Sequence, residues 1–250
     1  MALRPGLEHL ASGRRAARGG ASGRSGFHRG EHGYVGLGRR NDTKFADFWR
    51  YDPAANAWAQ LSDFPVATYS ASSFVIDDIA YVIDSAGALR GYGVATDVWT
   101  ERAPFRGKAR SSGVAFTLAG KGYFGTGFVE GGSAITSTRY ADLWQYDPGI
   151  DRWTRVADLP TGSLSGGVSF SIGEFGFVGS GNDFSGAFAQ FFRYDPSSDS
   201  WAVAGNYPPG GANGMVAFAI GQAAFIGTGY WSRLGLLGGD AAAFYRFAQK

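Results

Sequence analysis

The histidines and carboxylates of this 250-residue chain are the first residues to test for chemistry. His28 and His32, with Glu31 between them, have the H-x-x-E-H spacing of one class of zinc proteases. That chemistry needs a helix, so that both histidines share a face, and a further ligand. Here the motif contains Gly30 and is followed by Gly33, which indicates a strand and a turn. The sequence therefore predicts neither a metal site nor a cofactor.

A second motif has the glycine spacing of a phosphate-binding loop. Residues 120–125 spell G-x-G-x-x-G, which binds dinucleotides when it joins a strand to a helix. No helical pattern follows, and the equivalent glycines at 173–181 end a strand. We therefore exclude nucleotide binding. The absence of cysteine likewise excludes disulfides, thiolate metal sites and cysteine nucleophiles.

The carboxylates divide into recurring and non-recurring ones. Asp52, Asp147 and Asp195 stand at equivalent places in a repeat, so we interpret them as turn residues that accept local backbone hydrogen bonds. Glu130 and Asp183 do not recur, which makes them the better candidates for acid–base chemistry. An ordinary exposed loop acid is the alternative interpretation of both.

One stretch, residues 113–160, is repeated along the chain. Its first part, GVAFTLAGKGYFGTG, leads through a polar loop to ADLWQYDP and then to GIDRWTRVADLP. Five copies are recognisable, of which the last is incomplete. Equivalent positions follow one another at intervals of 47, 42, 54 and 48 residues, at Gly33, Ala80, Gly122, Gly176 and Ala224. Such a period is typical of propellers and solenoids.

Each copy predicts four strands. In the first, apolar residues alternate with small ones, as in Val114, Phe116 and Leu118, so one face is expected to be buried. The second ends in Gly-x-Gly, the third carries a tyrosine and the fourth opens with a tryptophan. The two aromatic residues are always seven positions apart, in the pairs Tyr51 and Trp58, Tyr92 and Trp99, Tyr146 and Trp153, and Tyr194 and Trp201. This spacing favours a hairpin that lays both rings on one side of a small sheet.

These glycines, tyrosines and tryptophans resemble the kelch repeat, the four-stranded blade of one class of β-propellers. The resemblance covers the chain from about residue 26 onward. It implies an all-β, kelch-type propeller with five recognisable blades, the last incomplete. The blades are expected at about residues 25–65, 66–105, 106–160, 161–209 and 210–250. Because kelch rings often have six or seven blades, a fragment of a six-blade ring is an alternative.

Residues 1–24 lack the repeat and are rich in Arg, Gly, Ala and Ser. We expect a disordered or extraneous leader there, with a transit peptide or a nucleic-acid arm as alternatives. No secretory signal is visible, so the compartment stays unknown; a secreted or periplasmic location requires a truncated N-terminus.

The net charge of +2 does not describe the body of the protein. Residues 1–40 carry about +6 and the remainder about −4. The basic pI is therefore a poor argument for nucleic acid, and we expect no such partner. No run of eighteen apolar residues exists, so we expect no membrane span.

In a propeller blade, the loop between the second and third strands and the loop that leads to the next blade emerge on one face. Residues that do not recur in these loops are the candidates for reading a ligand. We single out Arg106, Lys108, Arg110, Glu130, Arg139, Asp183, Tyr207, Trp231 and Arg233. The same predicted rim includes Arg39, Arg40, Lys44 and Asn213. Ordinary solvated charge and an anionic or sugar-like ligand both fit this basic rim.

The resemblance implies several possible functions, because kelch propellers include protein-binding adaptors, galactose oxidase and N-acetylneuraminate epimerase. The oxidase holds copper with histidines and tyrosines, one of them cross-linked to cysteine. This chain has no cysteine, and its histidines, His9, His28 and His32, all lie within the first 32 residues, so copper oxidase activity is excluded. We expect a binding or scaffolding module for a protein or glycan. The alternative is a carbohydrate-active isomerase that uses Arg110, Arg139 and Glu130.

Ring closure is the last expectation. The fifth copy stops after Phe247 without a tryptophan strand, and residues 1–24 offer no strand to replace it. We therefore expect the first strand of blade one and the end of blade five to be the least ordered parts, with a poorly packed seam between them.

Overall fold

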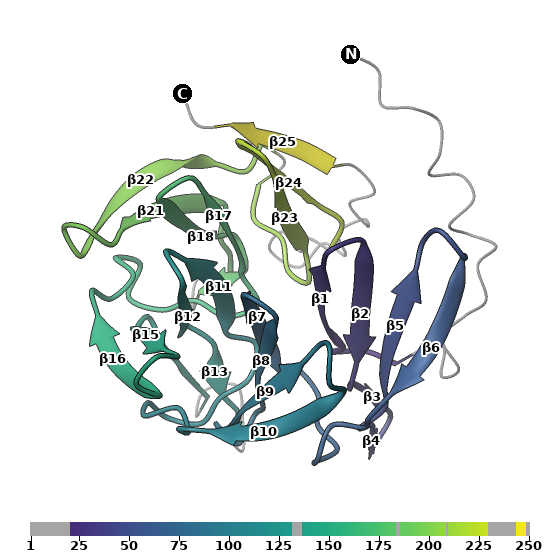
Figure 1. Ribbon diagram of the computed structural model, residues 1–250. Coiled ribbons are helices and arrows are strands. Elements are labelled where there is room, and N and C mark those ends of the chain that lie inside the picture. The colour runs from purple at the N-terminus through teal and green to yellow at the C-terminus, as the bar shows by residue number, and fades with distance from the viewer. Residues whose placement is uncertain (1–20, 132–136, 184–185, 209, 230–243, 249–250) are drawn as a thin grey trace.

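The computed structural model describes residues 21–131, 137–183, 186–208, 210–229 and 244–248. Within these ranges the chain forms strands, turns and loops and no helix. Figure 1 shows small sheets arranged around a common axis, which is the architecture of a β-propeller.

Five antiparallel sheets form the blades, and each begins with its innermost strand. Blade one contains β1 (Ser25–Arg29), β2 (His32–Gly36), β5 (Phe48–Asp52) and β6 (Ala57–Leu61). Blade two contains β7 (Ser72–Ile76), β8 (Ile79–Ile83), β9 (Leu89–Gly93) and β10 (Val98–Arg102). Blade three contains β11 (Val114–Leu118), β12 (Lys121–Gly125), β15 (Leu143–Asp147) and β16 (Arg152–Val156). Blade four contains β17 (Val168–Ile172), β18 (Phe175–Gly179), β21 (Gln190–Asp195) and β22 (Ser200–Asn206). Blade five has three described strands, β23 (Val216–Ile220), β24 (Ala223–Gly227) and β25 (Phe244–Ala248).

The predicted all-β propeller with five recognisable blades is confirmed, and within the described residues its last blade has three strands. Blade two has four strands like its neighbours, although it lacks the glycine pair and the Asp-Pro turn. Most of the expected leader lies outside the described residues. Ser22, near the end of the expected leader, forms an antiparallel backbone bridge with Arg39 of blade one.

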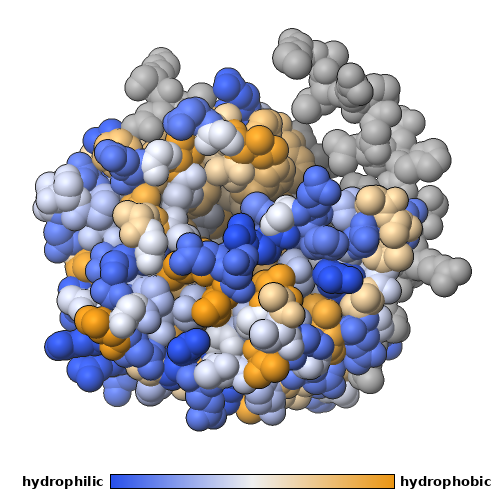
Figure 2. Space-filling view, in the orientation of Figure 1, coloured by the Kyte–Doolittle hydropathy of each residue, from blue (hydrophilic) through white to orange (hydrophobic). Residues whose placement is uncertain are grey.

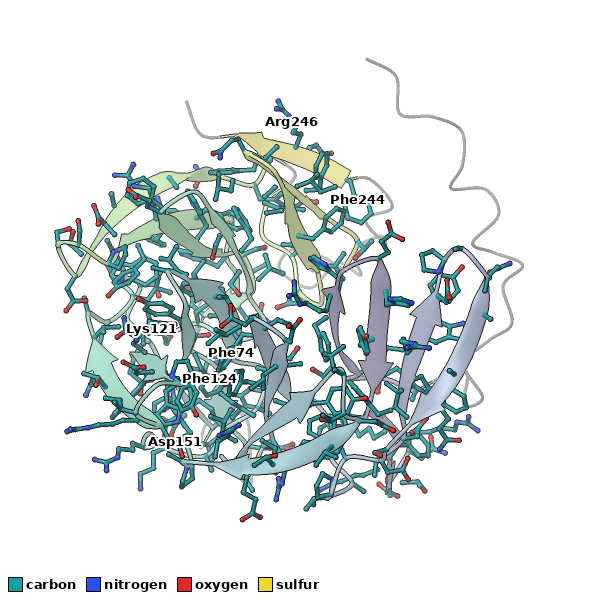
Figure 3. The ribbon with its side chains drawn as sticks, in the orientation of Figure 1. Phe74, Lys121, Phe124, Asp151, Phe244 and Arg246 are labelled. Atoms are coloured by element: carbon teal, nitrogen blue, oxygen red, sulfur yellow. The ribbon has the colours of Figure 1, made fainter. Side chains whose placement is uncertain are left out.

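The core consists of separate apolar layers between consecutive blades. The front of each blade is defined here as the face that carries the phenylalanine of its first strand, and the back as the opposite face. Phe74 and Phe124, labelled in Figure 3, come from the front of blade two and the back of blade three and share one cluster. Blades three and four, and blades four and five, pack in the same way. Each layer is therefore completed by the neighbouring blade.

Glycine in the second strand makes this packing possible. A Cβ on Gly122 or Gly176 would overlap the ring of Phe74 or Phe116 from the preceding blade. The Gly-x-Gly pair that ends the second strand is required for a different reason. A Cβ on Gly125 would overlap the backbone oxygen of Asp142, so only glycine lets the strands approach there.

A network that we call the blade latch ties the outer strands together. In blade two, Asp97 Oδ1 accepts hydrogen bonds from the Tyr92 hydroxyl at 2.7 Å and from the Ser62 amide of the preceding linker at 2.9 Å. Trp99 Nε1 donates to the Ser62 carbonyl at 3.0 Å. The latch therefore binds both the N–H and the C=O of one residue in the linker that comes from the preceding blade.

The latch recurs with the same spacing. In blade three, Asp151 and Trp153 hold both backbone groups of Ala103, and Tyr146 donates to Asp151. In blade four, Asp199, Trp201 and Tyr194 hold Ala157 in the same way. The recurring tyrosine and tryptophan thus act across blades as well as within them.

The latch environment alters the acidity of its members. Burial, followed by the hydrogen bond to Asp97, raises the pKa of Tyr92 far above its ordinary value. Burial acts to raise the pKa of Asp97 too, but the hydrogen bonds from Tyr92 and Ser62 outweigh it and lower that pKa. The latch therefore works with a neutral tyrosine and an ionised aspartate at neutral pH.

Hydroxyl groups form a ladder along the axis. Ser73 Oγ donates to the Gly26 carbonyl at 3.2 Å, and Thr117 Oγ1 donates to the Val75 carbonyl at 2.6 Å. Ser169 and Ser171 donate to blade three in the same way. Blade five carries Ala217 and Ala219 at these places, which lack the donor.

Candidate functional site

The strand register places the variable loops on one side of the ring. The start of the first strand pairs with the end of the second, as Ser25 pairs with Gly36, and Gly36 pairs with Phe48 at the start of the third strand. The loops that join second to third strands and the linkers between blades therefore share a side, which we call the loop face. On it lie three small hairpins: β3 (Arg39–Arg40) with β4 (Thr43–Lys44), β13 (Phe128–Val129) with β14 (Thr138–Arg139), and β19 (Asn182–Asp183) with β20 (Gly186–Ala187).

A hollow lies at the axis of the loop face. One residue from each blade, just before the first strand, adopts a positive φ at the wall of the hollow; these are Gly23, Ser70, Ser112, Gly166 and Gly214. The hollow has a volume of about 610 Å³. Because equivalent residues from all five blades meet there, a ligand that fills the hollow would contact every blade.

Arginine, amide and aromatic groups line this axial hollow. The Arg39 guanidinium lies over the Tyr69 ring at 4.3 Å. On another part of the wall, Arg139 Nε donates to Ser165 Oγ at 3.2 Å. Asn213 Nδ2 donates to Asn182 Oδ1 at 3.1 Å. Such a lining offers charge and hydrogen bonds to an anionic or polyhydroxylated ligand.

A second hollow, the lateral groove, runs between the linker of blades two and three and the edge of blade three. Its volume is about 620 Å³. Four sequence-predicted residues line it together, namely Arg106, Lys108, Arg110 and Arg139. Tyr140 and Trp144 add aromatic surface to the groove. The structure thus brings together residues that are up to 33 positions apart in the chain.

Within the groove, Arg110 is buried and held from several sides. It forms a bidentate ion pair with Asp142, in which Nη2 donates to Oδ2 at 3.0 Å. It also donates to the Thr126 carbonyl at 3.1 Å and lies over the Tyr140 ring at 3.9 Å. Burial acts to raise the pKa of Asp142, but the hydrogen bonds from Arg110 and Trp144 lower it overall. Arg110 therefore anchors the wall of the groove from within.

The remaining predicted residues lie apart. Glu130 is exposed just after β13, and Asp183 lies in β19, where it follows Asn182 of the axial hollow but does not line the hollow itself. Tyr207 is buried, and its ring contacts Tyr245 edge-on at 5.2 Å. Trp231 and Arg233 lie outside the described residues. A role in ligand binding stays a prediction for each of these residues.

Sequence reasoning did not single out the neutral residues of the hollows. Tyr69, Ser165 and Asn182 line the axial hollow, and Trp144 lines the groove; the charged Arg155 of the groove was not singled out either. The only available signal was the small residue that precedes each first strand, as in Ser112 and Gly166. The three recurring aspartates act as predicted, since Asp52, Asp147 and Asp195 each accept backbone hydrogen bonds from their own turns.

The described residues hold no group of three or more His, Asp or Glu side chains with the arrangement of a metal site. They also contain no helical segment with the length and hydropathy required to cross a bilayer.

Comparisons with known proteins agree with this architecture. No protein-family model matches the chain. Kelch-like protein 35 of Mus musculus is 29% identical over 154 residues, which are 59% of this chain and 24% of that protein. The N-acetylneuraminate epimerase of Yersinia enterocolitica is 30% identical over 125 residues, which are 48% of this chain and 32% of the epimerase. Kelch-like protein 25 of Xenopus tropicalis is 24% identical over 143 residues, 51% of this chain and 23% of that protein.

The chain therefore spans about a quarter to a third of the length of these relatives. Among solved structures, that of YjhT superimposes with a TM-score of 0.69 and 18% sequence identity. The match covers 84% of this chain and 73% of the YjhT chain, and at this identity it supports the fold alone.

Five radial sheets, joined by linkers on one face, define the molecule as a β-propeller. The recurring tyrosine and tryptophan, together with the similarity to kelch-like proteins, identify it as a kelch-repeat propeller.

Proposed function

We propose that this kelch-repeat propeller is a non-catalytic binding or scaffolding module that recognises a protein partner on its loop face. The similarity to Kelch-like proteins favours a protein-binding propeller, although the chain spans only part of their length. The observation that carries the proposal is the contrast between repeated blades and unrepeated loops. Latch, glycine and core positions recur, whereas the hairpins and linkers of the loop face differ between blades.

The residues of the lateral groove favour a partner with an acidic surface. Arg106 and Lys108 are exposed at the groove, and no described carboxylate forms an ion pair with either. Two other cations there are already paired, Arg110 with Asp142 and Arg155 with Asp158, and Arg139 donates to Ser165. Trp144 and Tyr140 supply the aromatic surface that protein interfaces favour. An acidic peptide with an apolar residue would therefore match both parts of the groove.

A peptide array tests this proposal. Acidic peptides and their amide counterparts, with Asp and Glu replaced by Asn and Gln, are probed with the full chain and with the Arg106→Glu, Lys108→Glu double variant. We expect the acidic peptides to be retained by the wild type and lost by the variant. Arg152→Glu is the matched control, because Arg152 is exposed and lies on the opposite side of the ring. Equal retention by the wild type and the double variant would reject the groove as the binding site.

The axial hollow favours a second candidate, a carbohydrate-active isomerase. Arg39 and Arg139 offer positive charge for a carboxylate, and Asn182 and Asn213 offer amides for hydroxyl groups. The similarity to an N-acetylneuraminate epimerase motivates the choice of substrate. NMR exchange between the anomers of N-acetylneuraminate, measured with the wild type, Arg139→Ala and Glu130→Ala, tests it. Exchange no faster than in buffer would remove this candidate and leave the binding module.

A further inference from the structure

The latches of blades two, three and four each bind a short segment of this same chain in the way that a peptide-binding site binds a peptide. Each holds the N–H and C=O of one small residue, Ser62, Ala103 or Ala157, with an aspartate and a tryptophan. Because main-chain groups are recognised, the mode sets the path of the bound segment and tolerates different side chains at that residue.

An apolar side chain two residues later completes the recognition. Phe64 contacts the Trp99 ring edge-on at 4.9 Å, and Phe105 contacts the Trp153 ring edge-on at 5.4 Å. In blade four the equivalent residue is Leu159, which is buried in a cluster with Trp201. The bound segments thus share a small residue, then Asp or Pro, then Phe or Leu.

Blade one carries the same latch. The Tyr51 hydroxyl donates to Asn56 Oδ1 at 2.8 Å, and Asn56 has a φ of 47°, close to the 54°, 48° and 46° of Asp97, Asp151 and Asp199. The rings of Tyr51 and Trp58 are 5.0 Å apart at 42°, as in the other blades. The site is therefore assembled in its binding geometry.

Among the described residues, no segment occupies this latch. No described amide N–H donates to Asn56 Oδ1, and no described acceptor takes the Trp58 Nε1 proton. Tyr51 is half-buried, whereas its equivalents Tyr92 and Tyr146 are fully buried. A Cβ on Gly33 would meet only the Tyr51 Cβ, at 3.9 Å, whereas Gly122 lies under a phenylalanine ring.

The seam between blades five and one is bordered on its other side by the front of blade five, and within the described part of the chain this face is also uncovered. Val216, Phe218 and Ile220 are 46%, 41% and 64% exposed, although their equivalents in blade three are 3–4% exposed. The Phe218 ring contacts the rings of Phe225 and Phe244, both in blade five, and no described aromatic ring of another blade. Figure 2 shows hydrophobic side chains over blade five at the top of the view, and Figure 3 labels Phe244 there.

We propose that the latch of blade one, formed by Tyr51, Asn56 and Trp58, binds an extended segment of a partner polypeptide. The segment presents a small residue whose N–H and C=O meet Asn56 and Trp58. Asp or Pro follows, then a Phe or Leu that packs against the Trp58 ring. This site lies at the outer edge of blade one and does not depend on the loop-face proposal.

A labelled peptide with the sequence of residues 155–161, RVADLPT, is the probe, and its binding to the full chain is measured by fluorescence anisotropy. We expect saturable binding. Asn56→Ala and Trp58→Phe each remove one backbone hydrogen bond and are expected to weaken binding about fivefold or more. Asn56→Asp restores the carboxylate of the other latches and is expected to tighten it, since charge-assisted hydrogen bonds are stronger.

Two controls keep the measurement specific. A peptide with serine in place of the leucine lacks the apolar side chain and is expected to bind poorly. Circular dichroism melting shows whether each variant remains folded, and Trp58→Phe keeps an aromatic ring for packing. Absence of saturable binding, or binding unchanged in both Asn56→Ala and Trp58→Phe, would overturn the proposal. Concentration-dependent self-association that Trp58→Phe abolishes would also overturn it, in favour of a second copy of the chain.

Discussion

The interface between blades three and four and the seam between blades five and one are lined by equivalent residues with opposite degrees of burial. Phe116 lies 4.9 Å from Tyr123 and under blade four, at 4% exposure, whereas Phe218 is 41% exposed. The sequence of a repeat therefore defines both faces of each blade, but the energy of a face depends on whether a neighbour covers it. Four pairs of substitutions test this difference, each with one change in a covered part of the ring and its counterpart in blade one or five, and one of these pairs also predicts a pH dependence.

The largest effect is expected from removing the innermost phenylalanine. Phe116→Ala leaves a cavity between two blades and is expected to lower the free energy of unfolding by about 3–5 kcal/mol. Phe218→Ala removes a partly exposed ring and is expected to cost at most about 1 kcal/mol. Urea unfolding of both variants measures the difference. Equal losses would mean that the front of blade five is covered in solution.

The next effect concerns the carboxylate that follows the second-strand glycines. Asp142→Asn leaves the buried Arg110 without its counter-charge and is expected to cost about 3 kcal/mol. Its counterpart in blade one, Asp47, has a buried Oδ1 without a hydrogen-bond partner among the described residues. Asp47→Asn is therefore expected to change stability by less than about 1 kcal/mol. The other oxygen, Oδ2, accepts a hydrogen bond from Trp49 Nε1 at 2.7 Å, so a large loss in Asp47→Asn would show that Oδ1 also has a partner in solution.

The same pair predicts a pH dependence. The folded-state pKa of Asp142 is lowered, so its contribution is fully present above the unfolded value of about 4 and is lost as pH falls through the folded pKa. Asp142→Asn is expected to reduce the acid sensitivity of unfolding in that range. Melting temperatures measured from pH 7 down to about pH 2 test the sign.

Breaking the latch is expected to have a smaller effect. Asp151→Ala leaves the buried Tyr146 hydroxyl and the Ala103 amide without their acceptor, for a loss of about 2 kcal/mol. Among the described residues, the acceptor that Asn56→Ala removes serves only the Tyr51 hydroxyl, so a loss below about 0.5 kcal/mol is expected. Denaturant midpoints of the two variants provide the comparison, and a larger loss in Asn56→Ala would reverse it.

The smallest effect comes from adding a single methyl group. Gly176→Ala places a Cβ against the Phe116 ring and is expected to cost about 1–2 kcal/mol. Gly33→Ala has space at the equivalent position and is expected to be neutral or slightly stabilising, because alanine restricts the unfolded chain. Thermal melting of both variants is sufficient, and a destabilised Gly33→Ala would indicate that the seam is occupied.

The sequence was sufficient for the fold because each repeat carries the same local signals. The alternation around Phe116, the glycines after it and the spacing from Tyr146 to Trp153 together predict the four strands of a blade. They succeeded even for blade two, where several of these signals are missing, since neighbouring blades fix the period. The expectation of a poorly packed seam is consistent with the exposure of Phe218.

The site was less predictable because its residues depend on partners far away in the sequence. Arg110 resembles an exposed loop cation in the sequence, but Asp142, 32 residues later, holds it inside the fold. Tyr207 is buried for a similar reason, since its contact with Tyr245 joins two blades. The latch role of Asp151 was also missed, because a turn aspartate gives no sequence signal of the amide that it accepts.

The missing hydroxyl groups of Ala217 and Ala219 have a consequence for how the molecule opens. Blades two, three and four are each fastened to the preceding blade by hydrogen bonds at the axis and by a latch at the rim. For the described part of blade five, the apolar layer and the linker contacts provide the attachment instead. In a chain of units coupled to their neighbours, the most weakly coupled end opens first. We therefore expect the described part of blade five to detach first when the protein is unfolded by force, while the other four blades remain stacked.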